Sequence, residues 1–182
     1  MNWDEYFLNI CNAVASKSPC LSRNIGAIIV RDNSIVSTGY NGPARGYPHC
    51  LPVQQFIVSK IDSEHIPILK PGEIIYTKNP SEAKISYTCP RRARGYKSGE
   101  GLLECPAAHA EVNCISNAAR LGTCVRGATM YMNTKEVACK DCMTAIVNSG
   151  ISTLVTLELL PYHEISLDIA RYGKVKLRRF EI

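Results

Sequence analysis

Two short motifs that lie far apart in the sequence constrain the fold of this chain most, because they must meet at one point to act together. The first is His109-Ala110-Glu111, and the second is Cys139-Lys140-Asp141-Cys142. One imidazole and two thiolates supply three zinc ligands and leave the fourth tetrahedral position open for water, as in catalytic zinc sites. The carboxylate of Glu111 is not needed as a ligand and is therefore free to carry protons.

Both motifs fall where a helix is predicted to begin, at about Ala108 and at Lys140. The N-terminal end of a helix is partially positive, which favours thiolates over thiols. Two cysteines that are three residues apart on a helical turn also point the same way. The alternative is that His109 caps a helix or packs in the core and that the cysteine pair is merely buried. The two motifs together favour a catalytic zinc, of the kind that deaminates nucleobases by hydrolysis.

The order of the predicted elements indicates an α/β fold. A helix opens the chain and ends near Ser18-Pro19, and two β-branched runs then form a hairpin with its turn at 32–34. The later elements alternate between helix and strand, and their expected ranges are 108–121, 128–132, 140–149, 151–157, 163–172 and 174–180. This order predicts a three-layer α/β/α fold with a mixed central sheet.

The segment from Asn41 to about Ala108 is irregular and holds most of the prolines, although Val53 to Ile61 is compatible with a short helix. We expect a long loop insert here, and an insert of this length in a compact domain is expected to be functional or held by cross-links.

Composition limits the class of protein. The chain has 182 residues, of which 46% are hydrophobic and 20% charged, so we expect a single domain over 1–182. Its apolar runs are too short or too interrupted to cross a bilayer, and Asp4 and Glu5 stand where a signal peptide would be basic. Nine cysteines, an odd number, favour thiolate ligands and free thiols in a reducing, cytoplasmic compartment. A net charge of +5 suits an anionic ligand such as a phosphate and does not require nucleic acid.

The two motifs resemble the signature of the zinc-dependent cytidine and deoxycytidylate deaminase family, in which a proline usually precedes the first cysteine. Ala138 occupies that position here. A proline in the first turn only presets the backbone, so its absence should leave the ligands in place. The segment Ser37 to Gly42, followed by His49-Cys50, is similar to the branch that acts on deoxycytidylate (dCMP). The resemblance implies a cytidine-deaminase-like fold and a pyrimidine nucleotide as the substrate.

The mechanism that the resemblance implies assigns roles to individual residues. Glu111 would deprotonate a zinc-bound water, hydroxide would add to the ring carbon that bears the amine, and ammonia would leave, giving deoxyuridylate (dUMP). Asn41 would contact the sugar, and Ala110 and Tyr162 would also bind substrate. Other substrates stay open, namely a modified dCMP, another cytosine nucleotide or nucleoside, or an RNA adenosine. A different class of protein, a non-catalytic zinc-stapled module that binds nucleic acid, also stays open.

Four further cysteines, Cys20, Cys50, Cys89 and Cys105, lie in predicted loops, and three of them flank the insert. The resemblance implies a second, structural zinc, since related deaminases carry cysteine ligands after the first helix and after the Gly-Tyr-Asn-Gly segment. Four thiolates would form a closed site and hold the insert in place. His49 is an alternative fourth ligand. The other interpretation is that these are scattered free thiols, because no short spacing links them.

Regulation is implied by the resemblance alone. Members of this branch are often homohexamers that dCTP activates and dTTP inhibits, with magnesium bound to the effector. Arg91, Arg92, Arg94 and Lys97 form the densest basic stretch, which is either a solvated loop or a phosphate clamp. The candidates for effector or phosphate contacts are Arg23, Tyr40, Arg91, Arg92 and Arg120.

Overall fold

The computed structural model describes residues 1–47, 49–50, 89, 91, 95–97 and 99–182. These form two compact units. The first unit comprises Met1–Ser18, Asn24–Gly42 and Ala108–Ile182, and the second comprises Pro19–Arg23 and Pro43–Ala107. The expectation of one domain over 1–182 stays a prediction. The helix predicted at Val53 to Ile61 lies outside the described residues.

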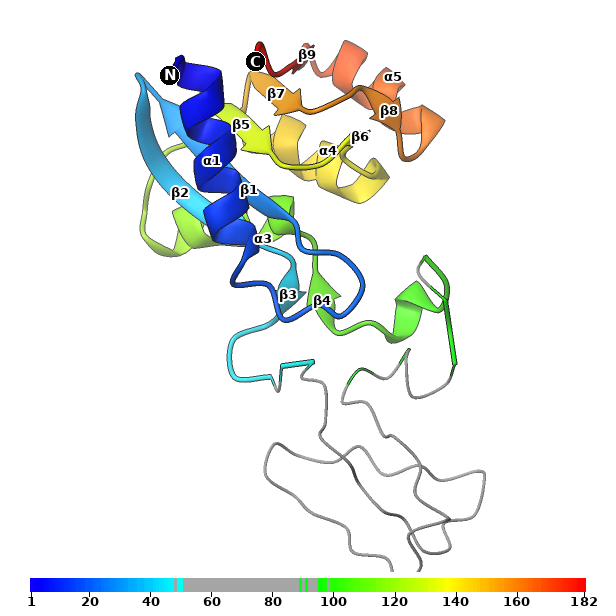
Figure 1. Ribbon diagram of the computed structural model, residues 1–182. Helices are drawn as coiled ribbons and strands as arrows, with labels where there is room; N and C mark the ends of the chain where they lie inside the picture. Colours follow the sequence, from blue (N-terminus) through cyan, green and yellow to red (C-terminus); the bar gives the residue numbers. More distant parts are fainter. Residues whose placement is uncertain (48, 51–88, 90, 92–94, 98) are drawn as a thin grey trace, which may run out of the picture. The chain divides into compact units, whose positions relative to one another are not determined.

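The first unit contains the predicted hairpin and the predicted alternation of helices and strands (Figure 1). Its helices are α1 (Trp3–Ala15), α3 (Ala110–Arg120), α4 (Lys140–Asn148) and α5 (Glu164–Tyr172). Its main strands are β1 (Gly26–Arg31), β2 (Ser34–Tyr40), β5 (Thr129–Met132), β7 (Thr153–Thr156) and β9 (Lys176–Arg179). The shorter elements are β3 (Gly42–Pro43), β4 (Ala107–Ala108), β6 (Glu136–Val137), β8 (Leu160–Pro161) and the 3₁₀ helix η2 (Leu102–Glu104).

The five main strands form one mixed sheet, as predicted, and their order is β2-β1-β5-β7-β9. Strand β1 is antiparallel to β2 and to β5, whereas β5, β7 and β9 are parallel. Asp32 and Asn33 turn the hairpin with φ values of 50° and 56°. Asp and Asn are the residues, besides glycine, that adopt this left-handed conformation most readily in a two-residue hairpin turn.

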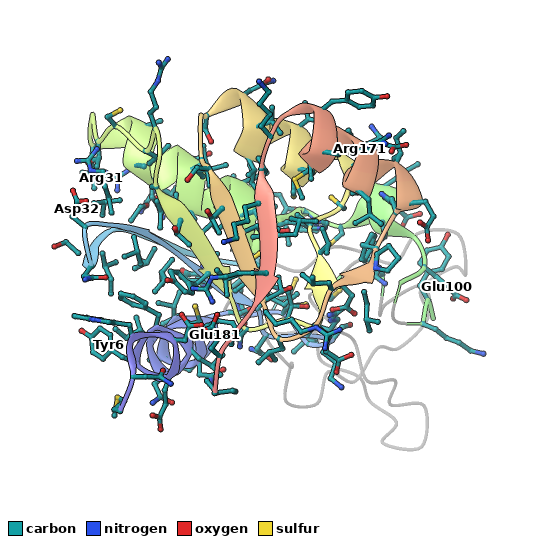
Figure 2. The ribbon with its side chains drawn as sticks, turned by 90° about the horizontal axis from the view of Figure 1, so that it is seen from above. Tyr6, Arg31, Asp32, Glu100, Arg171 and Glu181 are labelled. Atoms are coloured by element: carbon teal, nitrogen blue, oxygen red, sulfur yellow. The ribbon has the colours of Figure 1, made fainter. Side chains whose placement is uncertain are left out.

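Three layers are present in the first unit, in agreement with the sequence. Figure 2 shows α1 on one face of the sheet and α3, α4 and α5 on the other. Alternate residues of each strand divide between the two faces. Ile28 and Tyr131 pack with Phe7 of α1, whereas Ile29 and Met130 belong to the core beneath the other helices.

Each face of the sheet has a glycine where a helix comes closest. A Cβ atom at Gly26 would lie 2.2 Å from the carbonyl oxygen of Cys11 in α1, and one at Gly39 would lie 2.3 Å from the backbone nitrogen of Cys114 in α3. No real side chain tolerates such distances, so both helices pack directly against strand backbone. Because of Gly39, α3 and the metal-ligand motif at its start lie against β2.

The α1 face is closed by a network between the two ends of the unit. Arg178 of β9 donates hydrogen bonds from both terminal nitrogens to the carboxylate of Asp4, which also accepts from the backbone N–H of Glu181. Asn2 caps α1 through the N–H of Glu5 and donates to the carbonyl of Glu181, which lies beside α1 in Figure 2. The first helix and the last strand are thereby joined.

The second unit has little regular structure in its described part. Arg91 is buried, and its guanidinium donates to the carbonyls of Lys97 and Glu100. Tyr96 packs against Gly101, where a Cβ atom would meet its ring at 2.5 Å. These contacts hold the loop that leads into η2. No helix in the described part of the chain has both the length and the apolar composition required to cross a membrane.

Candidate metal centre and active site

His109, Cys139 and Cys142 meet in the first unit, as the sequence predicted. The Nδ1 atom of His109 lies 3.5 Å from the sulfur of Cys139 and 3.4 Å from that of Cys142, and the three ligand atoms lie within 4.8 Å of one another. Ligands at about 2.0 Å (nitrogen) and 2.3 Å (sulfur) from a tetrahedral zinc would be separated by about 3.5 Å. The donor set therefore fits zinc in both chemistry and spacing. Within the described residues, no other group of His, Cys, Asp or Glu side chains is as tight.

Two helix starts create this geometry. His109 is the N-cap residue of α3 and Cys139 that of α4, and neither side chain makes a capping hydrogen bond. The imidazole is therefore not used as a helix cap, which was the alternative interpretation. Cys142 lies in the first turn of α4, so its sulfur points to the same side as that of Cys139. Ala138, where the family usually has proline, is buried and does not displace the ligands.

The protonation of the ligands is set by their mutual contacts. Hydrogen bonds from Cys142 and then from His109 lower the pKa of Cys139 to about 4. The same contact with Cys139, followed by burial, raises the pKa of Cys142. The hydrogen bond with Cys139 also raises the pKa of His109. One thiolate is therefore already favoured in this cluster, and a divalent cation would favour the second.

Glu111 is buried in the first turn of α3, with 4% of its surface exposed. Burial is the main influence on its carboxyl group and raises the pKa, while the charge of His109 lowers it. A carboxyl group whose proton affinity is raised by burial suits a role in which it alternates between base and acid. Ala110, between the two functional residues, is buried as well.

Asn41 follows β2 and is held by the backbone of Ile25. Its side-chain oxygen accepts a hydrogen bond from the N–H of Ile25 at 2.8 Å, and its own N–H donates to the carbonyl of Ile25 at 3.1 Å. Its carbonyl accepts from the hydroxyl of Ser18. The side chain is only 9% exposed, so its amide is presented in a fixed orientation. A fixed amide suits a substrate contact.

Tyr162 lies in the loop before α5 and is 38% exposed. Its ring contacts that of His163 edge to face at 4.9 Å. The Nδ1 atom of His163 in turn accepts a hydrogen bond from the backbone N–H of Lys140, the first residue of α4. His163 thus places the Tyr162 loop beside the helix start that carries the thiols. Sequence reasoning missed this residue, since a lone histidine before a helix gives no signal of its partner.

The four further cysteines all belong to the second unit. Cys50 and Cys89 are buried, and the pKa of Cys50 is raised to about 12 by burial, by contacts with Cys89, and by the charges of Cys105 and Cys20. The four thiols are thus neighbours, although they are not as tightly grouped as His109, Cys139 and Cys142. All nine cysteines of the chain are free thiols.

The candidate phosphate contacts are dispersed. Arg91 is buried with two donors on loop carbonyls, Arg23 is exposed in the second unit, and Arg120 is exposed at the end of α3. Tyr40 ends β2, and its carbonyl accepts from Asn113. Arg92 lies outside the described residues.

Sequence comparison gives the family. The family model described as cytidine and deoxycytidylate deaminase zinc-binding region matches residues 1–158. The deoxycytidylate deaminase of Enterobacteria phage T4 is 33% identical over 154 residues, which are 83% of this chain and 75% of that protein. That of Mycobacterium phage D29 is 31% identical over 159 residues, 85% of this chain and 93% of that protein. The deoxycytidylate deaminase of Saccharomyces cerevisiae is 27% identical over 98% of this chain, which spans only 45% of the yeast protein.

Solved structures share the fold. The dCMP deaminase of cyanophage S-TIM5 in complex with dCMP and dUMP aligns with a TM-score of 0.60 and 18% identity, over 96% of this chain and 94% of that one. The Rib2 deaminase of Aspergillus oryzae aligns with a TM-score of 0.53 and 16% identity, over 98% of this chain and 84% of that one. Fold, ligand set and family model agree, and the chain belongs to the zinc-binding cytidine and deoxycytidylate deaminase family.

Proposed function

We propose that this protein deaminates dCMP by hydrolysis, releasing dUMP and ammonia. The observation that carries the proposal is the buried carboxyl group of Glu111 next to a set of only three metal ligands, His109, Cys139 and Cys142. A structural zinc site is closed by four ligands and has no use for a neighbouring carboxylate. The phage relatives, which are named deoxycytidylate deaminases, support dCMP as the substrate.

In this proposal His109, Cys139 and Cys142 hold a zinc ion, which when bound supplies Lewis-acid activation of a water molecule. Glu111 takes the proton from that water and delivers protons to the ring nitrogen and then to the departing amine. The bond that breaks joins the ring carbon to the amino nitrogen, and the oxygen of water takes its place. Burial supports this role for Glu111, because a raised pKa lets one carboxyl group accept and return a proton near neutral pH.

Substrate binding is assigned to residues around this centre. The fixed amide of Asn41 contacts the sugar, Ala110 borders the base at the start of α3, and Tyr162 contacts the phosphate or the sugar. The contact between His163 and the N-terminus of α4 supports the placement of Tyr162, since it holds the loop beside Cys139. The other candidates for a phosphate or effector contact are Arg23, Tyr40, Arg91, Arg92 and Arg120, which single alanine substitutions can separate by their effect on KM for dCMP.

The test is an ammonia-release assay with cytidine, deoxycytidine and their mono-, di- and triphosphates, together with a modified dCMP and an RNA adenosine substrate. We expect dCMP to give the highest kcat/KM. Glu111→Gln should keep zinc and fold but lose ammonia release. Glu164→Gln is the matched control, since Glu164 also lies in the first turn of a helix but is exposed. Full turnover by Glu111→Gln, or no turnover of any cytosine substrate by the wild type, contradicts the proposal.

We also propose a structural zinc in the second unit, bound by Cys20, Cys50, Cys89 and Cys105, with His49 as an alternative fourth ligand. The influence of the three other thiols on Cys50 supports the grouping, because a cation would stabilise the thiolates that these neighbours disfavour. Metal analysis should give two zinc ions per chain. Cys50→Ser should lower that number to one, whereas Cys124→Ser, which changes an exposed thiol, should leave it at two.

By family resemblance we further propose a homohexamer in the cytoplasm, activated by dCTP and inhibited by dTTP with magnesium on the effector. The exposed position of Arg120 in the last turn of α3 is compatible with a contact between subunits. Light scattering gives the subunit number, and the assay above, run with each triphosphate and with EDTA or magnesium, tests the regulation. A monomer with hyperbolic kinetics that neither triphosphate changes would refute this part alone.

A further inference from the structure

Helix α3 is attached to β2 by a row of side-chain hydrogen bonds. Asn113 donates from Nδ2 to the carbonyl of Tyr40 at 2.9 Å and to that of Gly42 at 3.1 Å. Asn117 donates to the carbonyl of Thr38 at 2.8 Å. Figure 1 shows α3 alongside β2, one of the two edge strands of the sheet. The helix therefore supplies donors to the outer edge of β2, which among the described residues pairs only with β1, and to Gly42 at the start of β3.

The spacing of these bonds is geometrically regular. Thr38, Tyr40 and Gly42 are two residues apart, so their carbonyls point to the same edge of an extended chain. Asn113 and Asn117 are one turn apart on the same side of α3, and the helix advances about 6 Å over that turn, close to the roughly 6.6 Å of two strand residues. Direct backbone packing at Gly39 fixes the distance between the two elements. The hydrogen bonds from the two asparagines to these carbonyls therefore fix the register between helix and strand.

The two asparagines differ in what their acceptors flank. The carbonyls bound by Asn113 belong to the residues on either side of Asn41, whereas the carbonyl bound by Asn117 lies three residues before it. Asn113 is also the nearer of the two to the start of α3, and its own N–H donates to the carbonyl of His109. One side chain thus connects the metal-ligand end of the helix to the segment that presents Asn41.

We infer that Asn113 is a positioning residue for the deaminase reaction, which acts by holding Asn41 in register with His109 and Glu111. Because Asn41 is a substrate contact only under the proposed function, this role rests on that function. Asn113 has both donor hydrogens of its amide on backbone carbonyls and does not itself touch substrate. Its removal should therefore weaken substrate binding through Asn41 and leave the proton transfers of Glu111 intact.

The experiment compares three single variants, Asn41→Ala, Asn113→Ala and Asn117→Ala. Two double variants add Asn113→Ala or Asn117→Ala to Asn41→Ala. Zinc content, kcat and KM for dCMP are measured for each protein. Asn113→Ala should raise KM about tenfold with less than a threefold change in kcat, the pattern of lost binding shared by ground and transition states. The pH profile of kcat should not move. Asn117→Ala should lower the melting temperature about as much as Asn113→Ala does, because each variant loses side-chain hydrogen bonds between α3 and the strand. It should leave KM for dCMP unchanged.

The double variants separate positioning from general stability. If Asn113 acts through Asn41, adding Asn113→Ala to Asn41→Ala should raise KM by less than twofold more, because coupled sites are not additive. Equal KM effects of Asn113→Ala and Asn117→Ala, or a full tenfold further rise in the double variant, would overturn the inference.

Two further controls complete the design. Where Asn113→Ala does not fold, Asn113→Gln keeps an amide donor displaced by one methylene group, and the same split between KM and kcat is expected. An unchanged KM for a folded Asn113→Gln counts against the inference. Absence of dCMP turnover by zinc-loaded wild type refutes the proposed function instead, and so the two failures are distinct.

Discussion

Two buried carboxylates lie on opposite faces of the same sheet, each in the first turn of a helix, and they have opposite environments. Asp4 of α1 is 7% exposed and Glu111 of α3 is 4% exposed. A hydrogen bond from Arg178 is the largest influence on Asp4 and lowers its pKa, whereas burial is the largest influence on Glu111 and raises its pKa. Both carboxyl groups lie at the same position of their helix, so their surroundings decide whether the pKa falls or rises.

The difference separates a structural face from a reactive one. Asp4 accepts from a guanidinium and from the N–H of Glu181, so its charge is satisfied and joins two elements. Among the described residues, Glu111 has no such cation as a fixed hydrogen-bond partner, and burial makes its ionised form less favoured. A group whose charge is satisfied by fixed partners contributes to stability, and a group that is held short of full ionisation is available for proton transfer.

The largest expected effect is on activity. Glu111→Gln should lower kcat for dCMP deamination by at least about 10³-fold, or about 4 kcal/mol in the activation barrier, because it removes the group that moves protons. Its melting temperature should stay within a few degrees of the wild type, since the amide keeps the shape of the side chain. Ammonia release and thermal unfolding of the same preparations give both values. A comparable loss of stability would show that Glu111 is structural, like Asp4.

The two glycines extend the comparison to packing. Gly39→Ala and Gly26→Ala should each destabilise the fold by about 3 kcal/mol, because a methyl group would push α3 or α1 off the strand backbone. The two variants should differ in their effect on the site. Under conditions where both remain folded, Gly39→Ala should lower kcat/KM, since α3 starts at His109, while Gly26→Ala should not. Urea unfolding and the ammonia assay measure the two effects, and equal activity would contradict a separate role for each face.

Asp4→Asn should cost about 2 kcal/mol at neutral pH, because it leaves Arg178 without its charged partner in a buried contact. The pKa of Asp4 is lower in the folded state, so its contribution is complete above the unfolded value of about 3.9 and is lost as the pH falls through the folded value. The difference in melting temperature between wild type and Asp4→Asn should therefore shrink as the pH falls from 5 to 2. A difference that does not depend on pH would exclude the ion pair as its cause.

The smallest expected effect concerns the Tyr162 loop. His163→Ala removes the acceptor for the N–H of Lys140 and should cost about 0.5 kcal/mol in stability, as for the loss of a helix cap. It should also raise KM for dCMP severalfold if Tyr162 binds substrate. His163→Asn supplies a side-chain oxygen in place of Nδ1 and should recover part of the loss. An unchanged KM in the alanine variant would remove Tyr162 from the list of substrate contacts.

The predicted parts of the fold are those with a strong local pattern. The β-branched runs predicted β1 and β2, and α3 and α4 were predicted to start at the two motifs, as they do. The metal ligands could be predicted because their chemistry restricts the residue type at each position. The two-residue strands β3, β4, β6 and β8 could not, because their pairing depends on tertiary contacts and leaves no pattern in so short a segment.

Side-chain partners that are distant in the sequence could not be predicted either. Arg178 lies on the edge strand β9 and pairs with Asp4 near the start of α1. Nothing in the composition of either segment identifies the other. The same holds for His163 with the N–H of Lys140 and for Asn113 with the carbonyls beside Asn41, since a backbone donor or acceptor has no sequence signature.

The contact between Asp4 and Arg178 spans 174 positions of the chain. During synthesis on the ribosome, α1 cannot form this contact until β9 has been made and has joined the sheet beside β7. Phe180 joins the core cluster that contains Phe7 at the same late stage. The apolar side of α1 can pack on β1 as soon as that strand has been made, but its core cluster lacks Phe180 and Asp4 lacks its cation until β9 joins the sheet, so burial on this face is completed late.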